Sequence, residues 1–146
     1  MFVIGYKGFN KDFTNRYGNK FEIGKVYHAD GEIKWGNNGN GFHLCTNIED
    51  CFRYVDPDTS VITEVIGFGK MKEYDDEYYG YYDMYVCENL RIVRVISREE
   101  IISMMLHTYA DRRNRFIRDY NLTEAELKLF EGVESNDVVK SEDLAT

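Results

Sequence analysis

His43 and the three cysteines are the side chains in this sequence best suited to chemistry. His43 stands between Phe42 and Leu44, so strand alternation places its ring on the face opposite to these two apolar side chains. An imidazole titrates near neutral pH, so His43 could contact a ligand or act as an acid or base. The alternative is a partly buried histidine that hydrogen-bonds to the backbone.

The cysteines raise the question of a metal site. Thiolate and imidazole groups are preferred zinc ligands, and one set can be drawn from His43, Cys45, Cys51 and Cys87. The spacing His-x-Cys-x5-Cys with a distant fourth ligand matches no common zinc motif, so no metal site is predicted. An odd number of cysteines without a Cys-x-x-Cys pair also gives no disulfide framework.

A second kind of chemistry is concentrated between Glu73 and Glu88, where six acidic residues and six of the 12 tyrosines occur without a base. Tyrosine offers a rigid apolar ring with a polar tip, which suits binding surfaces. Carboxylates among such rings could occupy the basic surface of a protein partner. The predicted partner-binding residues are Tyr74, Asp75, Asp76, Glu77, Tyr78, Tyr79, Tyr81 and Tyr82. The alternative is a solvated loop whose tyrosines pack partly on the sheet.

A cluster of basic residues is formed by Arg112-Arg113-Asn114-Arg115 and Arg118. On a helix, Arg112, Arg115 and Arg118 share one exposed face. This patch could pair with the acidic tyrosine segment, or could form ion pairs within its own helix. The formal net charge of -8 argues against binding of nucleic acid, because phosphate backbones attract basic proteins.

The composition sets the frame for these residues. A chain of 146 residues that is 43% hydrophobic and 15% aromatic has the length and the apolar content for one ordinary core. The sequence has no apolar run of about 18–20 residues, so no membrane partner is expected. The first residues lack the features of a signal peptide, and cytoplasmic localisation is predicted.

The elements that must position these side chains change in type along the chain. Short strands are predicted over residues 2–96, including a hairpin that turns at Glu88-Asn89. Ser97 with Glu100 predicts the start of one uninterrupted helix, and Thr123 with Glu126 that of a second. The expected class is therefore α+β, with a mostly antiparallel sheet followed by two C-terminal helices. One domain is expected over residues 1–132, with an acidic flexible tail over 133–146.

Three motifs occur in an order that resembles an uncharacterised domain family of phage and bacterial proteins. They are Lys7-Gly8-Phe9, Gly24-Lys25-Val26-Tyr27 and Gly41-Phe42-His43-Leu44-Cys45. The resemblance covers about residues 3–100 and implies a phage or bacterial origin, with the host cytoplasm as the location of a phage-encoded protein. Members often carry cysteines at the positions of Asn15 and Gly36, which this chain lacks.

The layout also resembles, more distantly, the ADP-ribosyltransferase-like domains. This resemblance implies NAD as cofactor and three candidate catalytic residues: Lys7 in place of the NAD-holding arginine, His43 in the second region and Glu64 as the later acid. Lysine lacks the forked donor geometry of arginine, so the first motif departs from the pattern. The alternative for Lys7 is a stem packed on neighbouring aromatic rings with the amine in water.

The sequence as a whole predicts a non-enzymatic acidic binding module that uses no cofactor. Its expected partner is a protein with a basic surface, such as a basic host protein that the module would inhibit. An NAD-dependent ADP-ribosyltransferase-like enzyme is one alternative. A structural accessory domain of a larger assembly is the other.

Overall fold

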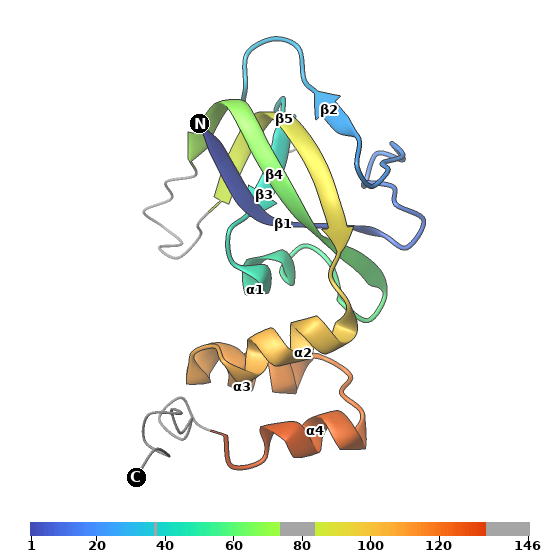
Figure 1. Ribbon diagram of the computed structural model, residues 1–146, viewed down its shortest axis with the longest axis vertical. Coiled ribbons are helices and arrows are strands. Elements are labelled where there is room, and N and C mark those ends of the chain that lie inside the picture. The colour runs from blue at the N-terminus through green and yellow to red at the C-terminus, as the bar shows by residue number, and fades with distance from the viewer. Residues whose placement is uncertain (37, 74–83, 134–146) are drawn as a thin grey trace. The chain divides into compact units, whose positions relative to one another are not determined.

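Strands come first along the chain and helices follow in the computed structural model, which describes residues 1–36, 38–73 and 84–133. The chain divides into two compact units, Met1–Ile96, here called unit 1, and the part from Ser97 onward, here called unit 2. Unit 1 holds the strands and a short helix, and unit 2 holds the remaining described helices (Figure 1). This order confirms the predicted α+β class.

Unit 1 is built on an antiparallel sheet. Its described elements are β1 (Phe2–Asn10), β2 (Val26–His28), β3 (Phe42–Cys45), α1 (Ile48–Cys51), β4 (Ser60–Glu73) and β5 (Met84–Val95). The strand order is β2-β5-β3-β1-β4, and β5 also pairs with β4. Strands β1, β4, β5 and β3 therefore form a closed ring of antiparallel pairs, to which β2 is added along β5.

The ring closes at one residue pair. β1 is in register with β4 over its whole length, but β1 and β3 share the single pair Tyr6↔Cys45. A side chain at Gly5, next to this pair, would overlap Leu44 and the Cys45 carbonyl, so only a glycine lets the two strands approach so closely. Within the described residues no further pair joins β1 to β3, and the two strands diverge after Tyr6.

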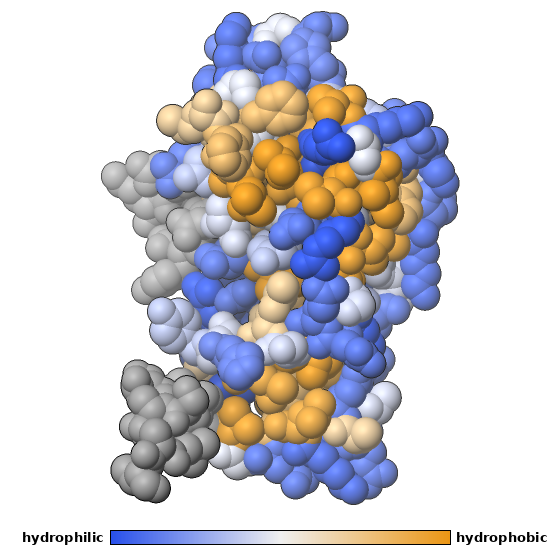
Figure 2. All heavy atoms as spheres, in the orientation of Figure 1, coloured by the Kyte–Doolittle hydropathy of each residue, from blue (hydrophilic) through white to orange (hydrophobic). Residues whose placement is uncertain are grey.

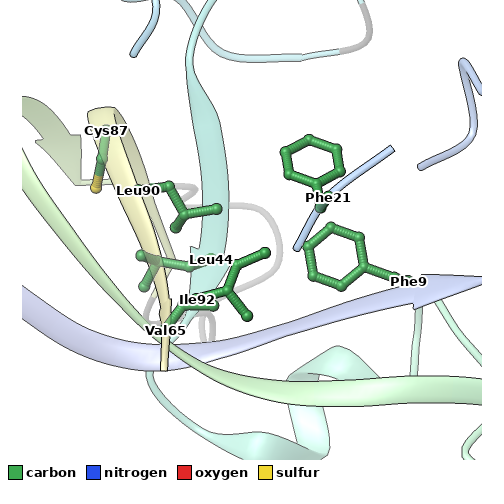
Figure 3. Close-up of a cluster of buried hydrophobic side chains, with 7 residues drawn as sticks. All are labelled: Phe9, Phe21, Leu44, Val65, Cys87, Leu90 and Ile92. Atoms are coloured by element: carbon green, nitrogen blue, oxygen red, sulfur yellow. The ribbon is translucent and has the colours of Figure 1, made fainter. Parts of the chain in front are cut away.

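The core of unit 1 fills the ring. One cluster of it is formed by the buried side chains of Phe9, Phe21, Leu44, Val65, Cys87, Leu90 and Ile92 (Figure 3). The rings of Phe9 and Phe21 lie side by side with centroids 5.0 Å apart. Each such side chain contributes about 1.5–3 kcal/mol by leaving water, so this cluster holds the strands that carry the site.

The predicted hairpin turn at Glu88-Asn89 is wrong, because β5 runs without interruption from Met84 to Val95. Asn89 is a common turn residue, yet here its amide is satisfied inside the sheet. Its Nδ2 donates to the Phe68 carbonyl at 3.3 Å, and its Oδ1 lies 2.7 Å from Nδ1 of His28. Neighbouring strands on both sides therefore accommodate a residue that local sequence assigns to a turn.

Unit 2 contains α2 (Arg98–Leu106), α3 (Ala110–Asp119) and α4 (Glu124–Phe130). Both predicted capping boxes are confirmed. The Ser97 hydroxyl accepts from the Glu100 N–H at 3.2 Å, and the Thr123 hydroxyl accepts from the Glu126 N–H at 3.1 Å. Each pair satisfies backbone donors that the first turn of a helix leaves unbonded.

The one uninterrupted helix predicted after Ser97 is wrong, since α2 ends at Leu106 and α3 begins at Ala110. Buried Arg113 explains the break. Its Nη1 lies 3.4 Å from the carbonyls of both Leu106 and Thr108, to which it donates. The guanidinium thus takes up carbonyls that a continuing helix would have bonded to its own backbone.

Apolar side chains also reach the outer surface of unit 1. Figure 2 shows hydrophobic side chains among hydrophilic ones on the face in view. Exposed apolar residues of this unit include Phe2, Ile4, Ile23 and Val26. Among the described helices, none is long and apolar enough to cross a membrane.

Candidate functional site

A cleft of about 740 Å³ lies in unit 1, where β1 and β3 diverge. Its lining comes from β1, the chain that follows it, the segment before β3, β3 itself and the turn after α1. The volume suits a small organic ligand. Lys7 and His43 both line it, so the structure brings together two of the three residues that the sequence proposed for catalysis.

Lys7 reaches across the gap between the two strands. Its Nζ donates to the His43 carbonyl at 2.6 Å and lies 6.0 Å from the centroid of the Phe9 ring. Lys7 and Phe9 alternate along β1 and so share the face that Phe9 buries in the core. Burial lowers the pKa of Lys7 below its usual value, because the apolar surroundings disfavour the ammonium form.

His43 is held by the segment that precedes β3. Its Nε2 accepts from the Gly36 N–H at 3.2 Å, and its ring packs against the edge of Trp35 with centroids 5.1 Å apart. Burial, with a smaller effect of the Lys7 charge, lowers the pKa of His43 to about 4. The imidazole is therefore neutral at pH 7, and the Gly36 contact assigns its proton to Nδ1.

Glu64 is not among the described residues that line the cleft, and it lies on the sheet face opposite to Lys7. It is the β4 partner of Tyr6, and residues opposite each other in an antiparallel pair point to the same face. Tyr6 and Lys7 are neighbours in β1 and point to opposite faces. The Glu64 carboxylate is 3.2 Å from Nε of Arg94, so its charge is paired there.

The charge of the cleft is opposite to that of the molecule. Among the described lining residues, the basic ones are Lys7 and Arg16, and none is Asp or Glu. The whole chain, in contrast, carries a net charge of -8. His43 adds no charge at neutral pH because its pKa is lowered to about 4. A local positive field in a partly enclosed space favours an anionic ligand.

Aromatic rings form much of the remaining wall. Trp35, Tyr17 and Tyr54 line the cleft, and the two tyrosines are 62% and 59% exposed. Such rings offer flat faces on which a planar ligand can stack. Sequence reasoning missed Arg16, Trp35 and Tyr54 as site residues. The single Trp of the chain, next to a glycine, was a signal that could have found one of them.

Two of the cysteines border the same cleft. Cys45 and Cys51 are buried with Met84, and Tyr6 and Trp35 pack against them. A hydrogen bond with Cys45, together with burial, raises the pKa of the Cys51 thiol well above its usual value. The Cys51 side chain is therefore a thiol at neutral pH. All three cysteines are free, and within the described parts of the chain no group of three or more His, Cys, Asp or Glu is placed to hold a metal ion.

The predicted partner-binding residues from Tyr74 to Tyr82 lie outside the described residues. In the arginine patch of α3, the Nε of Arg118 pairs with Asp119 at 2.8 Å. The guanidinium of Arg112 lies 5.7 Å from the centre of the Tyr109 ring. Asn15 and Gly36, the two positions at which the family resemblance places cysteines, both line the cleft.

Comparison with known proteins adds a family and no relative of known activity. No curated protein and no solved structure matches this sequence. A family model described as "Domain of unknown function (DUF7666)" matches residues 3–104. These residues include every described side chain that lines the cleft. The chain therefore belongs to the DUF7666 family of domains of unknown function.

Proposed function

We propose that this protein is a binding module whose cleft holds a small anionic ligand with a flat ring. The observation that carries the proposal is the contrast in charge: Lys7 and Arg16 line the cleft of a molecule with net charge -8. Cations that line a cleft of an acidic protein give an anion a local attractive field, whereas the net charge of the molecule would repel it. The aromatic wall then selects for a planar ligand.

The test is a set of binding measurements that separate charge from shape. Titration by NMR, with a planar phosphate and its neutral, dephosphorylated counterpart as probes, should give binding of the phosphate only. Lys7→Met and Arg16→Gln should each weaken it by about tenfold or more, the effect expected when a charge-assisted hydrogen bond is lost. Arg115→Gln removes the same charge from an exposed position in α3 and is the matched control.

Equal binding of the charged and uncharged probes would contradict the proposal. So would equal weakening by Arg115→Gln, because the effect would then come from net charge and not from the cleft. Circular dichroism of each variant separates a loss of binding from a loss of folding.

A macromolecular partner is a further part of the proposed function. The mixture of tyrosines and carboxylates between Tyr74 and Tyr82 supports a surface that binds a basic protein, such as a host protein that this chain would inhibit in the cytoplasm. Replacing Tyr78, Tyr79, Tyr81 and Tyr82 by Ser should remove that partner from a pull-down. An unchanged set of captured proteins would contradict it. Stable self-association without a ligand would instead favour an accessory domain of a larger assembly.

A second candidate function is NAD-dependent transfer of ADP-ribose. The presence of Lys7 and His43 in one cleft favours it, whereas Glu64, which is not among the described lining residues, does not. It predicts that NAD binds and that Lys7→Ala and Glu64→Ala both abolish hydrolysis. Calorimetry without a heat of NAD binding at millimolar concentration would exclude it.

A further inference from the structure

We propose that Lys7 is a reactive amine that forms an imine with a small anionic aldehyde or ketone bound in the cleft. This inference rests on the proposed function for the charge of the ligand, but the covalent step is its own claim. It would make the cleft a site of carbonyl capture in addition to a site of anion binding.

The position of Lys7 differs from that of other lysines in unit 1. Lys25 pairs with Glu22 at 2.7 Å and Lys34 lies 3.8 Å from Glu32, and both lysine side chains are 62% exposed. Lys7 instead lies between strands, beside the Phe9 ring. Of the lysines that the structure describes, Lys7 is the one that lines the cleft. A desolvated lysine next to apolar groups is the usual setting for imine chemistry.

The hydrogen-bond partner of Lys7 is compatible with a nucleophilic amine. The Nζ donates to a neutral acceptor, the His43 carbonyl, at 2.6 Å. A carboxylate partner would stabilise the ammonium form, whereas a carbonyl accepts a hydrogen bond from the ammonium and from the neutral amine alike. Burial lowers the pKa of Lys7, which increases the neutral fraction at a given pH. The contact also keeps the nitrogen between β1 and β3.

The covalent step needs no oxidant or further reactant. The lone pair of the neutral Lys7 amine attacks the carbonyl carbon, and a C–N bond forms. The carbonyl oxygen then leaves as water with the two protons that the nitrogen loses, and the C–N bond becomes double. Arg16 also lines the cleft and is the cation that we assign to the anionic group of the ligand.

Pyridoxal 5′-phosphate, an anionic aromatic aldehyde, is the probe for the experiment. The full-length protein is incubated at pH 7 with one equivalent of probe, reduced with borohydride and mapped by peptide mass spectrometry. We expect Lys7 to carry most of the label. Lys7→Arg should remove that label, and Lys25→Arg should leave it unchanged. The labelling rate of Lys7 should reach its half-maximum at a lower pH than that of Lys25, whose pKa is raised by its bond to Glu22.

If the wild-type protein carries the label on its exposed lysines without preference for Lys7, the inference is wrong. This outcome does not depend on whether the variants fold. Pyridoxine 5′-phosphate, which has the same ring and phosphate but no aldehyde, separates the two proposals. If it binds and Lys7 is not labelled, the imine is wrong and the anion site stands. If Lys7 is labelled and pyridoxine 5′-phosphate neither binds nor competes, the anion site is wrong and the reactive lysine stands.

Discussion

At the scale of single residues, the neutral imidazole of His43 links the stability of unit 1 to pH. The pKa of His43 is lowered to about 4 in the folded protein, below the value of about 6.5 for an unfolded chain. Between these two pH values the unfolded chain binds a proton at His43 that the folded chain does not. The free energy of unfolding therefore falls as the pH is lowered through this range.

The expected size of this effect is about 1–2 kcal/mol between pH 6.5 and 4, after allowance for the solvent that screens a partly exposed ring. Urea denaturation at several pH values measures it as the difference between the wild type and His43→Gln, which should lack this part of the pH dependence. His107→Gln, at an exposed position, controls for the loss of a histidine. Parallel curves for the wild type and His43→Gln would contradict the prediction.

Arg113 is the second residue with a specific energetic role. It is 2% exposed, and its Nη1 donates to the carbonyls of Leu106 and Thr108 at the end of α2. Arg113→Ala should lower the free energy of unfolding by about 1–3 kcal/mol, because two partly buried carbonyls lose this donor. Chemical denaturation followed by circular dichroism measures the loss. Arg115→Ala, an exposed neighbour in α3, should cost less than about 0.5 kcal/mol, and an equal cost would refute the role of Arg113.

At the scale of elements, β1 and the turn after α1 are packed too closely for a side chain at Gly8. A Cβ there would overlap both methyl groups of Val55. Gly8→Ala should destabilise the protein by about 1–3 kcal/mol, as overpacked cores do. Val55→Ala in the same chain should restore most of that loss, since it removes the overlapping methyl groups. Thermal denaturation of the two single variants and the double variant gives the coupling, and additive losses would contradict the contact.

The same scale shows what local sequence can predict. Ser97 with Glu100 and Thr123 with Glu126 mark helix starts correctly, because a capping box is complete within four residues. The ends of elements depended on distant partners. Asn89 stays within β5 because Phe68 and His28 bond its side chain, and α2 ends where Arg113 reaches back to it. Neither contact has a local signal.

Some residues of the candidate site could be predicted from the sequence, and others could not. The motifs around Lys7 and His43 identify residues that do share a cleft, although they stand far apart in the sequence. The position of Glu64 was not predictable without the β1–β4 register, since a shift of one residue would move its side chain to the other face. Arg16 carries no motif and joins the site only through the fold.

At the scale of the whole molecule, all the described residues that line the cleft belong to unit 1. Its described lining runs from Tyr6 to Met84, and the core cluster that supports it ends at Ile92. A chain of residues 1–96 should therefore fold and bind the same anionic probe within about threefold of the full-length affinity. Circular dichroism and the NMR titration test this, with a chain ending at Leu106, after α2, for comparison. Binding by the longer chain alone would show that the site needs residues beyond Ile96.

The single pair that closes the strand ring has a consequence for where unit 1 opens first. Separating Tyr6 from Cys45 breaks very few backbone bonds, whereas separating β1 from β4 breaks a ladder of nine residue pairs. Local opening should therefore start at this seam, and the amide hydrogens of β3 that face β1 should exchange with deuterium sooner than those between β1 and β4. For the proposed binding module, this seam between β1 and β3 is therefore the expected point of ligand entry.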